Sequence, residues 1–136
     1  MSVTLIRLSN FIEEFRKLDS EMQAQTMLAL LYIARMDKTD SPATVKDVGD
    51  YLGVSTAAAS RNVAALSAWS RHQKPGHDLV EATENPAFRS QKFIRLTAKG
   101  KRMIKTLEEN YDFSLVKFIS QLAQQIRVIF DYIYHP

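Results

Sequence analysis

Cysteine is absent from this chain of 136 residues. Without a thiol, the protein forms no disulfide, has no thiolate nucleophile and cannot build a thiolate zinc site. Long apolar runs are also missing, since none approaches the ~20 residues that a membrane-spanning helix needs. Residues 1–15 lack a basic leader and a small-residue cleavage site, so we expect a cytoplasmic protein with no membrane segment.

Glycine and proline are scarce, with four of each, and Pro75 with Gly76 is expected to break any helix that follows Leu66. The hydrophobic content of 46% and the charged content of 24% are those of a folded globular protein. We therefore expect a single domain over residues 1–136 rather than a disordered tail or a fibrous repeat.

Negative charge is scarce in one part of the chain. Residues 71–105 contain nine basic and three acidic residues, although the whole chain has a net charge of only +3. Such a basic block suits contacts with phosphate groups, and a solvated basic face is the alternative interpretation.

Residues 44–68 have the pattern of a helix-turn-helix. Thr44 and Asp47 are spaced as a capping box, which predicts a helix that starts directly after Thr44. Gly53 has the position of the left-handed residue that ends this helix, and Ser55 has the side chain of the next N-cap. The second helix has an apolar stripe of Ala58, Ala59, Val63 and Leu66. Its other side, which is expected to face outward, consists of Thr56, Ala57, Ser60, Arg61 and Ala64.

Helices are also expected before and after this motif. Apolar residues recur at helical spacing over residues 3–18, which predicts an amphipathic first helix. Residues 20–37 are apolar on most sides, which predicts a central core helix with Asp19 or Ser20 as its cap.

Two segments after the motif predict a β-hairpin, or wing, over residues 79–97. Residues 79–82 and 92–96 have strand-like side chains, and the turn-rich residues 83–91 separate them. Thr97 precedes another helix with a basic first turn. Because cations there oppose the helix dipole, its basic residues are expected to face an anion. They are Lys99, Lys101 and Arg102.

Two features of the linker between motif and wing each have two interpretations. Trp69 continues the spacing of the apolar stripe and is expected in the core, with a base-stacking platform as the alternative. His72, His77 and Asp78 are expected to be solvated, because their spacing matches no zinc pattern. We expect no metal and no cofactor.

The C-terminal residues have an apolar seam with spacings of 4, 3, 4, 3 and 4. It consists of Leu115, Ile119, Leu122, Ile126, Ile129 and Ile133. A chain of this size could bury the seam internally, but the first helix also needs a partner. We favour a homodimer in which the first and last helices of both subunits intertwine. Its expected contact residues are this seam together with Leu5, Phe11 and Phe15.

In this order, the elements resemble the MarR-like winged-helix transcription regulators. The resemblance covers residues 20–109 and a long C-terminal helix. It rests on MLALLYIARM, on TVKDVGDYLGVS followed by Ser60-Arg61 and Leu66, and on IRLTAKGKRMI after the wing. It implies a mainly α fold with a small β-hairpin wing, in which dimerisation helices (1–18 and 106–136) flank a DNA-binding core (20–105).

The resemblance also implies site residues. Those that match the family's contacts in the major groove are Thr56, Ala57, Ser60 and Arg61. Arg89 is the nearest match to the wing arginine that reaches the minor groove. Counting back from Thr97, the family's wing aspartate and arginine correspond to Phe88 and Ser90, so Arg89 is one residue out of register. The linker 67–78 is also longer than is usual in the family.

The leading hypothesis is a dimeric transcription regulator that binds duplex DNA. The motif's second helix offers few donors and acceptors among its alanines, so we expect little base readout per subunit. Affinity is expected from basic side chains on phosphates, and selectivity from half-site spacing and groove width. These side chains are Lys46, Arg71, Lys74, Arg89, Lys92, Arg95 and Lys99.

The alternative is a winged-helix interaction protein that binds a protein partner, such as polymerase or a replication component. The sparse recognition helix and the displaced wing arginine favour this alternative. Sensing of a small molecule stays open. Enzymatic activity is not expected, because no paired-carboxylate, Ser-His-Asp, metal or phosphate-loop pattern is present in the sequence.

Overall fold

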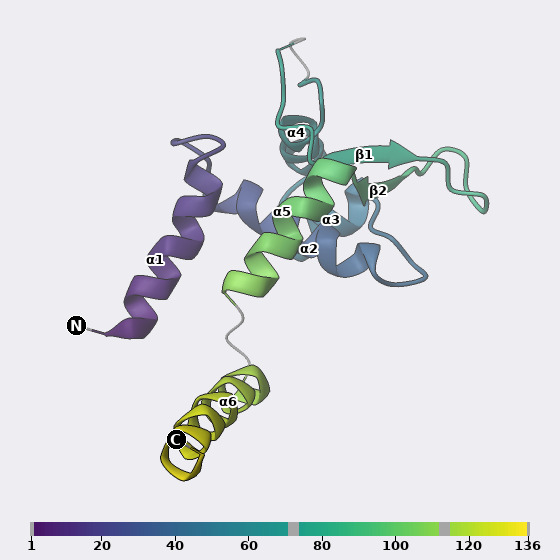
Figure 1. The fold of residues 1–136 in the computed structure, drawn as a ribbon. Helices are drawn as coiled ribbons and strands as arrows, with labels where there is room; N and C mark the ends of the chain where they lie inside the picture. The colour runs from purple at the N-terminus through teal and green to yellow at the C-terminus, as the bar shows by residue number, and fades with distance from the viewer. Residues whose placement is uncertain (1, 71–73, 112–114, 136) are drawn as a thin grey trace.

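Six helices and one β-hairpin make up the described part of the chain (Figure 1). The computed structural model describes residues 2–70, 74–111 and 115–135, with only the backbone at 115–118. The elements are α1 (Val3–Arg16), α2 (Ala24–Asp37), α3 (Val45–Leu52), α4 (Thr56–Leu66), β1 (Val80–Thr83), β2 (Phe93–Leu96), α5 (Ala98–Asn110) and α6 (Leu115–Tyr134). This mainly α architecture with a small hairpin confirms the predicted winged-helix fold.

Local hydrogen bonds define the helix-turn-helix formed by α3 and α4. The Thr44 hydroxyl accepts from the Asp47 amide at 3.2 Å, and the Asp47 carboxylate accepts from the Thr44 amide at 3.0 Å. Gly53 ends α3 with a φ of 69°, and the Ser55 hydroxyl accepts from the Ala58 amide at 3.2 Å to begin α4. The capping box, the left-handed glycine and the second cap are therefore confirmed.

Helix α2 lies at the centre of the core, as predicted, and Ala29, Leu30 and Ile33 are fully buried on it. Its start differs from the prediction. The N-cap is Gln23, which makes no side-chain capping bond, whereas the Asp19 carboxylate accepts from the Glu21 amide at 2.9 Å. Asp19 thus stabilises a turn before α2, because its short side chain is satisfied by the nearest amide.

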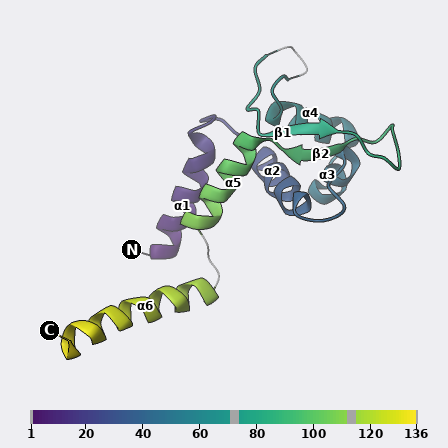
Figure 2. The ribbon, with the colours of Figure 1, turned by 45° about the vertical axis from the view of Figure 1, so that its right-hand side comes forward.

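Strand β2 is bonded along both of its edges. It pairs antiparallel with β1, with Val80 opposite Leu96. On its other edge, the Ile94 amide donates to the carbonyl of Ala43 at 2.7 Å, directly before α3 begins. The hairpin is therefore joined to the helix-turn-helix and projects beside it (Figure 2).

The start of α5 packs closely against the chain that enters β1. The Thr97 hydroxyl accepts from the Gly100 amide at 3.0 Å and donates to the Asp78 carbonyl at 2.7 Å. A Cβ atom on Gly100 would lie 2.1 Å from the Leu79 carbonyl oxygen, so only glycine permits this approach.

Helix α1 lies beside α5 in both views (Figures 1 and 2). The ring of Phe11 packs edge-on against Tyr111, and the Tyr111 hydroxyl donates to the Glu14 carboxylate at 3.2 Å. A hydrogen bond from Lys17 lowers the pKa of Glu14, which keeps this acceptor ionised. Phe15 is fully buried in the protomer's own core, so its predicted place on a dimer surface is wrong.

Helix α6 stands apart from the other helices in both views. All described side chains from Ile119 onward are exposed, including the five seam residues from Ile119 to Ile133. No helix within the described residues has both the length and the apolar character needed to cross a membrane.

The contact between Gly100 and Leu79 predicts a specific sensitivity to substitution. Gly100→Ala should lower the free energy of unfolding by about 1–3 kcal/mol, because the new methyl group displaces backbone rather than a flexible side chain. Lys101→Ala, at an exposed position of the same helix, should change it by less than about 0.5 kcal/mol. Urea denaturation at equal protein concentrations measures both; equal stabilities for the two variants would contradict this account.

Candidate nucleic-acid interface

The outward side of α4 is polar and accessible, as the sequence predicts. Thr56, Ala57 and Arg61 are exposed and Ser60 is half-buried, whereas Ala59, Val63 and Leu66 of the apolar stripe are buried in the core. Ala58 of the stripe is only half-buried. This helix therefore presents a narrow row of small side chains and one guanidinium to solvent.

A buried hydrogen bond that the sequence analysis missed fixes α4 against α2. The Asn62 side-chain oxygen accepts from the Thr26 hydroxyl at 2.8 Å, and its amide nitrogen donates to the Ala58 carbonyl at 3.1 Å. Both side chains are buried. An asparagine inside an alanine-rich helix was the only signal, and it does not identify a partner 36 residues away.

A groove of about 630 Å³ separates α4 from the hairpin. We call it the α4–hairpin groove. Its lining includes Lys46 from the first turn of α3, Thr56 and Ser60 from α4, Trp69, and Lys92 directly before β2. Both lysines are exposed. The groove thus has positive charge on two of its walls.

Arg61 lies on the other side of α4, where it lines a second cavity of about 520 Å³ together with Gln23 and Gln25. Asp19 and Glu21 line the same cavity. The predicted contact residues of α4 therefore face two directions. Thr56 and Ser60 face the hairpin, and Arg61 faces the turn before α2.

The other predicted basic residues are distributed over several surfaces. Arg89 is exposed in the hairpin loop and Lys74 is exposed in the connection between α4 and β1. Lys99 lies near α1, and its ammonium donates to the His77 carbonyl at 2.9 Å, so its partner within the chain is a neutral carbonyl oxygen and not an anion. Arg71 lies outside the described residues.

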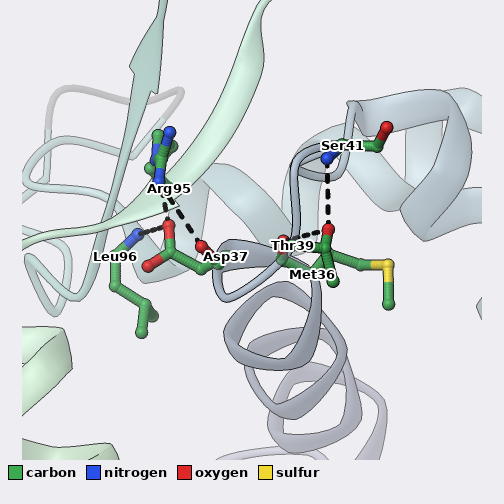
Figure 3. A network of polar contacts seen from close by, with 6 residues as sticks. All are labelled: Met36, Asp37, Thr39, Ser41, Arg95 and Leu96. Atoms are coloured by element: carbon green, nitrogen blue, oxygen red, sulfur yellow. Dashed lines mark hydrogen bonds and ion pairs between the residues drawn. The ribbon is translucent and has the colours of Figure 1, made fainter.

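Arg95, which was predicted to contact phosphate, forms an ion pair with a carboxylate of the chain itself. Its Nε donates at 3.1 Å to the Asp37 carboxylate, which also accepts from the Leu96 amide at 3.3 Å (Figure 3). The Asp37 side chain is only 8% exposed. Because a buried carboxylate needs a compensating charge, the Arg95 guanidinium is engaged by Asp37, and we do not propose Arg95 as a phosphate contact.

Trp69 also departs from its prediction. Its side chain is 65% exposed, because the chain turns away from the core after Leu66 rather than continuing the helix.

The two linker histidines form no metal site in the described part of the chain. The His77 imidazole lies 3.7 Å from the Asp19 carboxylate, and His72 lies outside the described residues. Within residues 2–70, 74–111 and 115–135, no group of three or more histidine, aspartate and glutamate side chains could hold a metal ion.

A helix-turn-helix joined to a β-hairpin at its side defines the winged-helix class of protein. A scan against protein-family models finds no match to this chain, and a search of curated proteins finds none either. The assignment of this chain to the winged-helix class therefore rests on its fold.

Solved structures with the same fold include several transcriptional regulators. One from Thermotoga maritima aligns with a TM-score of 0.61 and 20% identity, over 96% of this chain and 83% of the other. A MarR-family regulator from a Rhodococcus species aligns with a TM-score of 0.54 and 16% identity, over 98% and 88%. The S. aureus MepR protein, in a complex with DNA, aligns with a TM-score of 0.59 and 13% identity, over 97% and 99%. The chain thus has the fold of the MarR-like regulators that its sequence resembles.

The ion pair of Asp37 predicts that Arg95 stabilises the fold. Arg95→Ala should lower the free energy of unfolding by about 1 kcal/mol or more, because it leaves the buried Asp37 carboxylate without its cation. Water reaches the half-exposed guanidinium, which keeps the loss moderate. Arg89→Ala, in the exposed hairpin loop, serves as the control and should have little effect in the same urea titration. An Arg95→Ala protein as stable as the wild type would contradict a structural role.

Proposed function

We propose that this protein is a homodimeric transcription regulator that binds duplex DNA, with α4 in the major groove and the hairpin beside it. The observation that supports it most directly is the exposed outward side of α4, which stands between two accessible cavities and is held firmly by Asn62. A helix presented in this way fits the width of the major groove. The MepR protein, which has the same fold, is seen in a complex with DNA.

The proposed contacts divide into two kinds. Thr56, Ala57, Ser60 and Arg61 would face base edges, and Arg61 is the one residue among them with the bidentate geometry that suits guanine. The proposed phosphate contacts are Lys46, Arg71, Lys74, Arg89, Lys92 and Lys99. No ion pair is found for Lys46, Arg61 or Lys92 among the described residues, so binding an anion there breaks no described salt bridge.

Duplex binding across a salt series tests this proposal. The logarithm of the wild-type binding constant should fall linearly with the logarithm of salt concentration, and Lys92→Ala should reduce that slope by about 0.9 per protomer. Arg61→Ala should instead alter which sequences a mixed duplex pool retains, with a loss of about 1–3 kcal/mol at the base it reads. The measurement is fluorescence anisotropy of labelled duplex, followed by sequencing of the retained pool.

Lys105→Ala is the matched control, since Lys105 is an exposed lysine on α5 that lines neither cavity beside α4. It should leave both the slope and the retained sequences unchanged. If the wild type binds no duplex even at low salt, the proposal fails. The alternative of a winged-helix protein that binds a polymerase or replication component then takes its place.

The homodimer rests on apolar surface that the single chain leaves exposed. On α6 the seam residues Ile119, Leu122, Ile126, Ile129 and Ile133 are all between 45% and 61% exposed. Leu5 is likewise exposed on α1, and the half-buried Phe11 borders the exposed part of that helix. The side chain of Leu115 is not among those that the structure describes. Apolar surface of this extent is typical of an interface, and a second copy would cover both helices at once.

We predict that Ile126→Glu weakens the dimer by at least about tenfold, because the carboxylate must be desolvated where an isoleucine side chain was buried. Light scattering after size-exclusion chromatography should find the wild type at twice the chain mass of 15.5 kDa and the variant shifted towards one chain. Gln124→Glu, at a polar position of α6, adds the same charge and should leave the dimer intact. If the wild type is a monomer at micromolar concentration, the dimer proposal is wrong. The duplex-binding measurement still tests the DNA-binding proposal separately.

A further inference from the structure

Trp69 is the only tryptophan in the chain, and its indole is 65% exposed. Tryptophan is among the residues with the most apolar area to bury, so its exposure in a protein with a well-filled core calls for a reason. It lies immediately after α4 and lines the α4–hairpin groove.

The backbone around Trp69 is held in a fixed position by a short antiparallel stem. Trp69 and Pro75 form a β-bridge, the Gly76 amide donates to the Ala68 carbonyl at 2.9 Å, and the Ser70 amide donates to the Lys74 carbonyl at 2.9 Å. A Cβ atom on Gly76 would lie 1.9 Å from the Ser67 carbonyl oxygen, so the two arms of the stem approach closely. The stem therefore presents the indole at a defined place beside α4.

The α4–hairpin groove combines this apolar ring with positive charge and with hydroxyl groups. Lys46 and Lys92 supply two cations, and Thr56 and Ser60 supply hydroxyls from α4. A DNA strand alternates between anionic phosphates and the less polar faces of deoxyribose. The residues of this groove match that alternation, because its charges can bind phosphates while its apolar ring covers a sugar.

We infer that the α4–hairpin groove takes one sugar–phosphate strand of duplex DNA, with the indole of Trp69 packed against a deoxyribose. This inference rests on the proposed function and adds a contact outside the recognition helix and the wing. The strand would pass between Lys46 and Lys92, which lie on two walls of the groove. Trp69 would then strengthen binding without reading a base.

Intrinsic fluorescence tests this inference directly, because all tryptophan emission comes from Trp69. In the unbound wild-type protein, acrylamide should quench the exposed indole efficiently. A saturating pool of mixed duplexes of about 20 base pairs, two helical turns long, should lower the quenching constant at least about twofold. Labelled-duplex anisotropy in the same samples establishes that DNA is bound.

A variant series separates this contact from phosphate binding. Trp69→Ala should weaken duplex binding about five- to thirtyfold, and Trp69→Phe should recover part of the loss. Neither should change the salt slope, since no phosphate loses a cation, whereas Lys92→Ala should reduce it. Thermal unfolding of Trp69→Ala should match the wild type, because the side chain is exposed.

The outcomes distinguish this inference from the proposed function. If anisotropy reports binding but acrylamide quenching of Trp69 is unchanged, the groove does not hold DNA and the regulator proposal stands without it. If the protein binds no duplex at all, both are overturned. Binding that is protected from acrylamide, with affinity lost in Trp69→Ala and partly regained in Trp69→Phe, supports the inference.

Discussion

The position of the hairpin depends on strand β2, which is bonded to different parts of the chain on its two edges. One edge pairs with β1, and the other binds the carbonyl of Ala43 just before α3. The Asp37 carboxylate at the end of α2 adds bonds to Arg95 and to the Leu96 amide. A hairpin of two four-residue strands is marginal alone, so these contacts are what hold it beside the helix-turn-helix.

This attachment determines what α4 can present to a partner. Asn62 and Thr26 hold the inner side of α4 against α2, and the hairpin forms a wall along one of its flanks. The outward residues are therefore displayed on a rigid support with cationic side chains nearby. For a ligand with regularly spaced charges, such a preorganised surface reduces the ordering cost of binding.

The helices at the two ends of the chain leave many large apolar side chains exposed. Helix α1 is anchored through Phe15 and Tyr111, yet much of its apolar side remains accessible, and the described seam residues of α6 are all exposed. The cavity of about 820 Å³ between α1, α2 and α5 is lined mainly by apolar residues, among them Phe11, Leu31 and Ile104. In the proposed dimer, one two-fold axis would relate the two copies of this region and the two copies of α4. The dimer contact would therefore set the distance between the two DNA half-sites.

The amino-acid sequence by itself determined the features that depend on near neighbours. Capping by Thr44, Ser55 and Thr97 and the turn at Gly53 each involve residues within a few positions of one another, so the helix boundaries around the motif were predictable. The strands followed, to within one residue, from their strand-like side chains, and the seam of α6 from its spacing.

Only the tertiary structure decided that Phe15 is buried, that Trp69 is exposed and that Arg95 forms an ion pair. These outcomes depend on residues far along the chain. Apolar spacing placed Phe15 on a helix but could not say whether the protomer's own core would cover it. Charge placed Arg95 in a basic block, but the buried Asp37 that binds it lies 58 residues away. The apolar spacing of α4 extends in the sequence to Trp69, but the helix itself ends at Leu66. Long-range packing overrides local pattern at such positions because burial and ion pairing depend on the three-dimensional neighbours that the fold supplies.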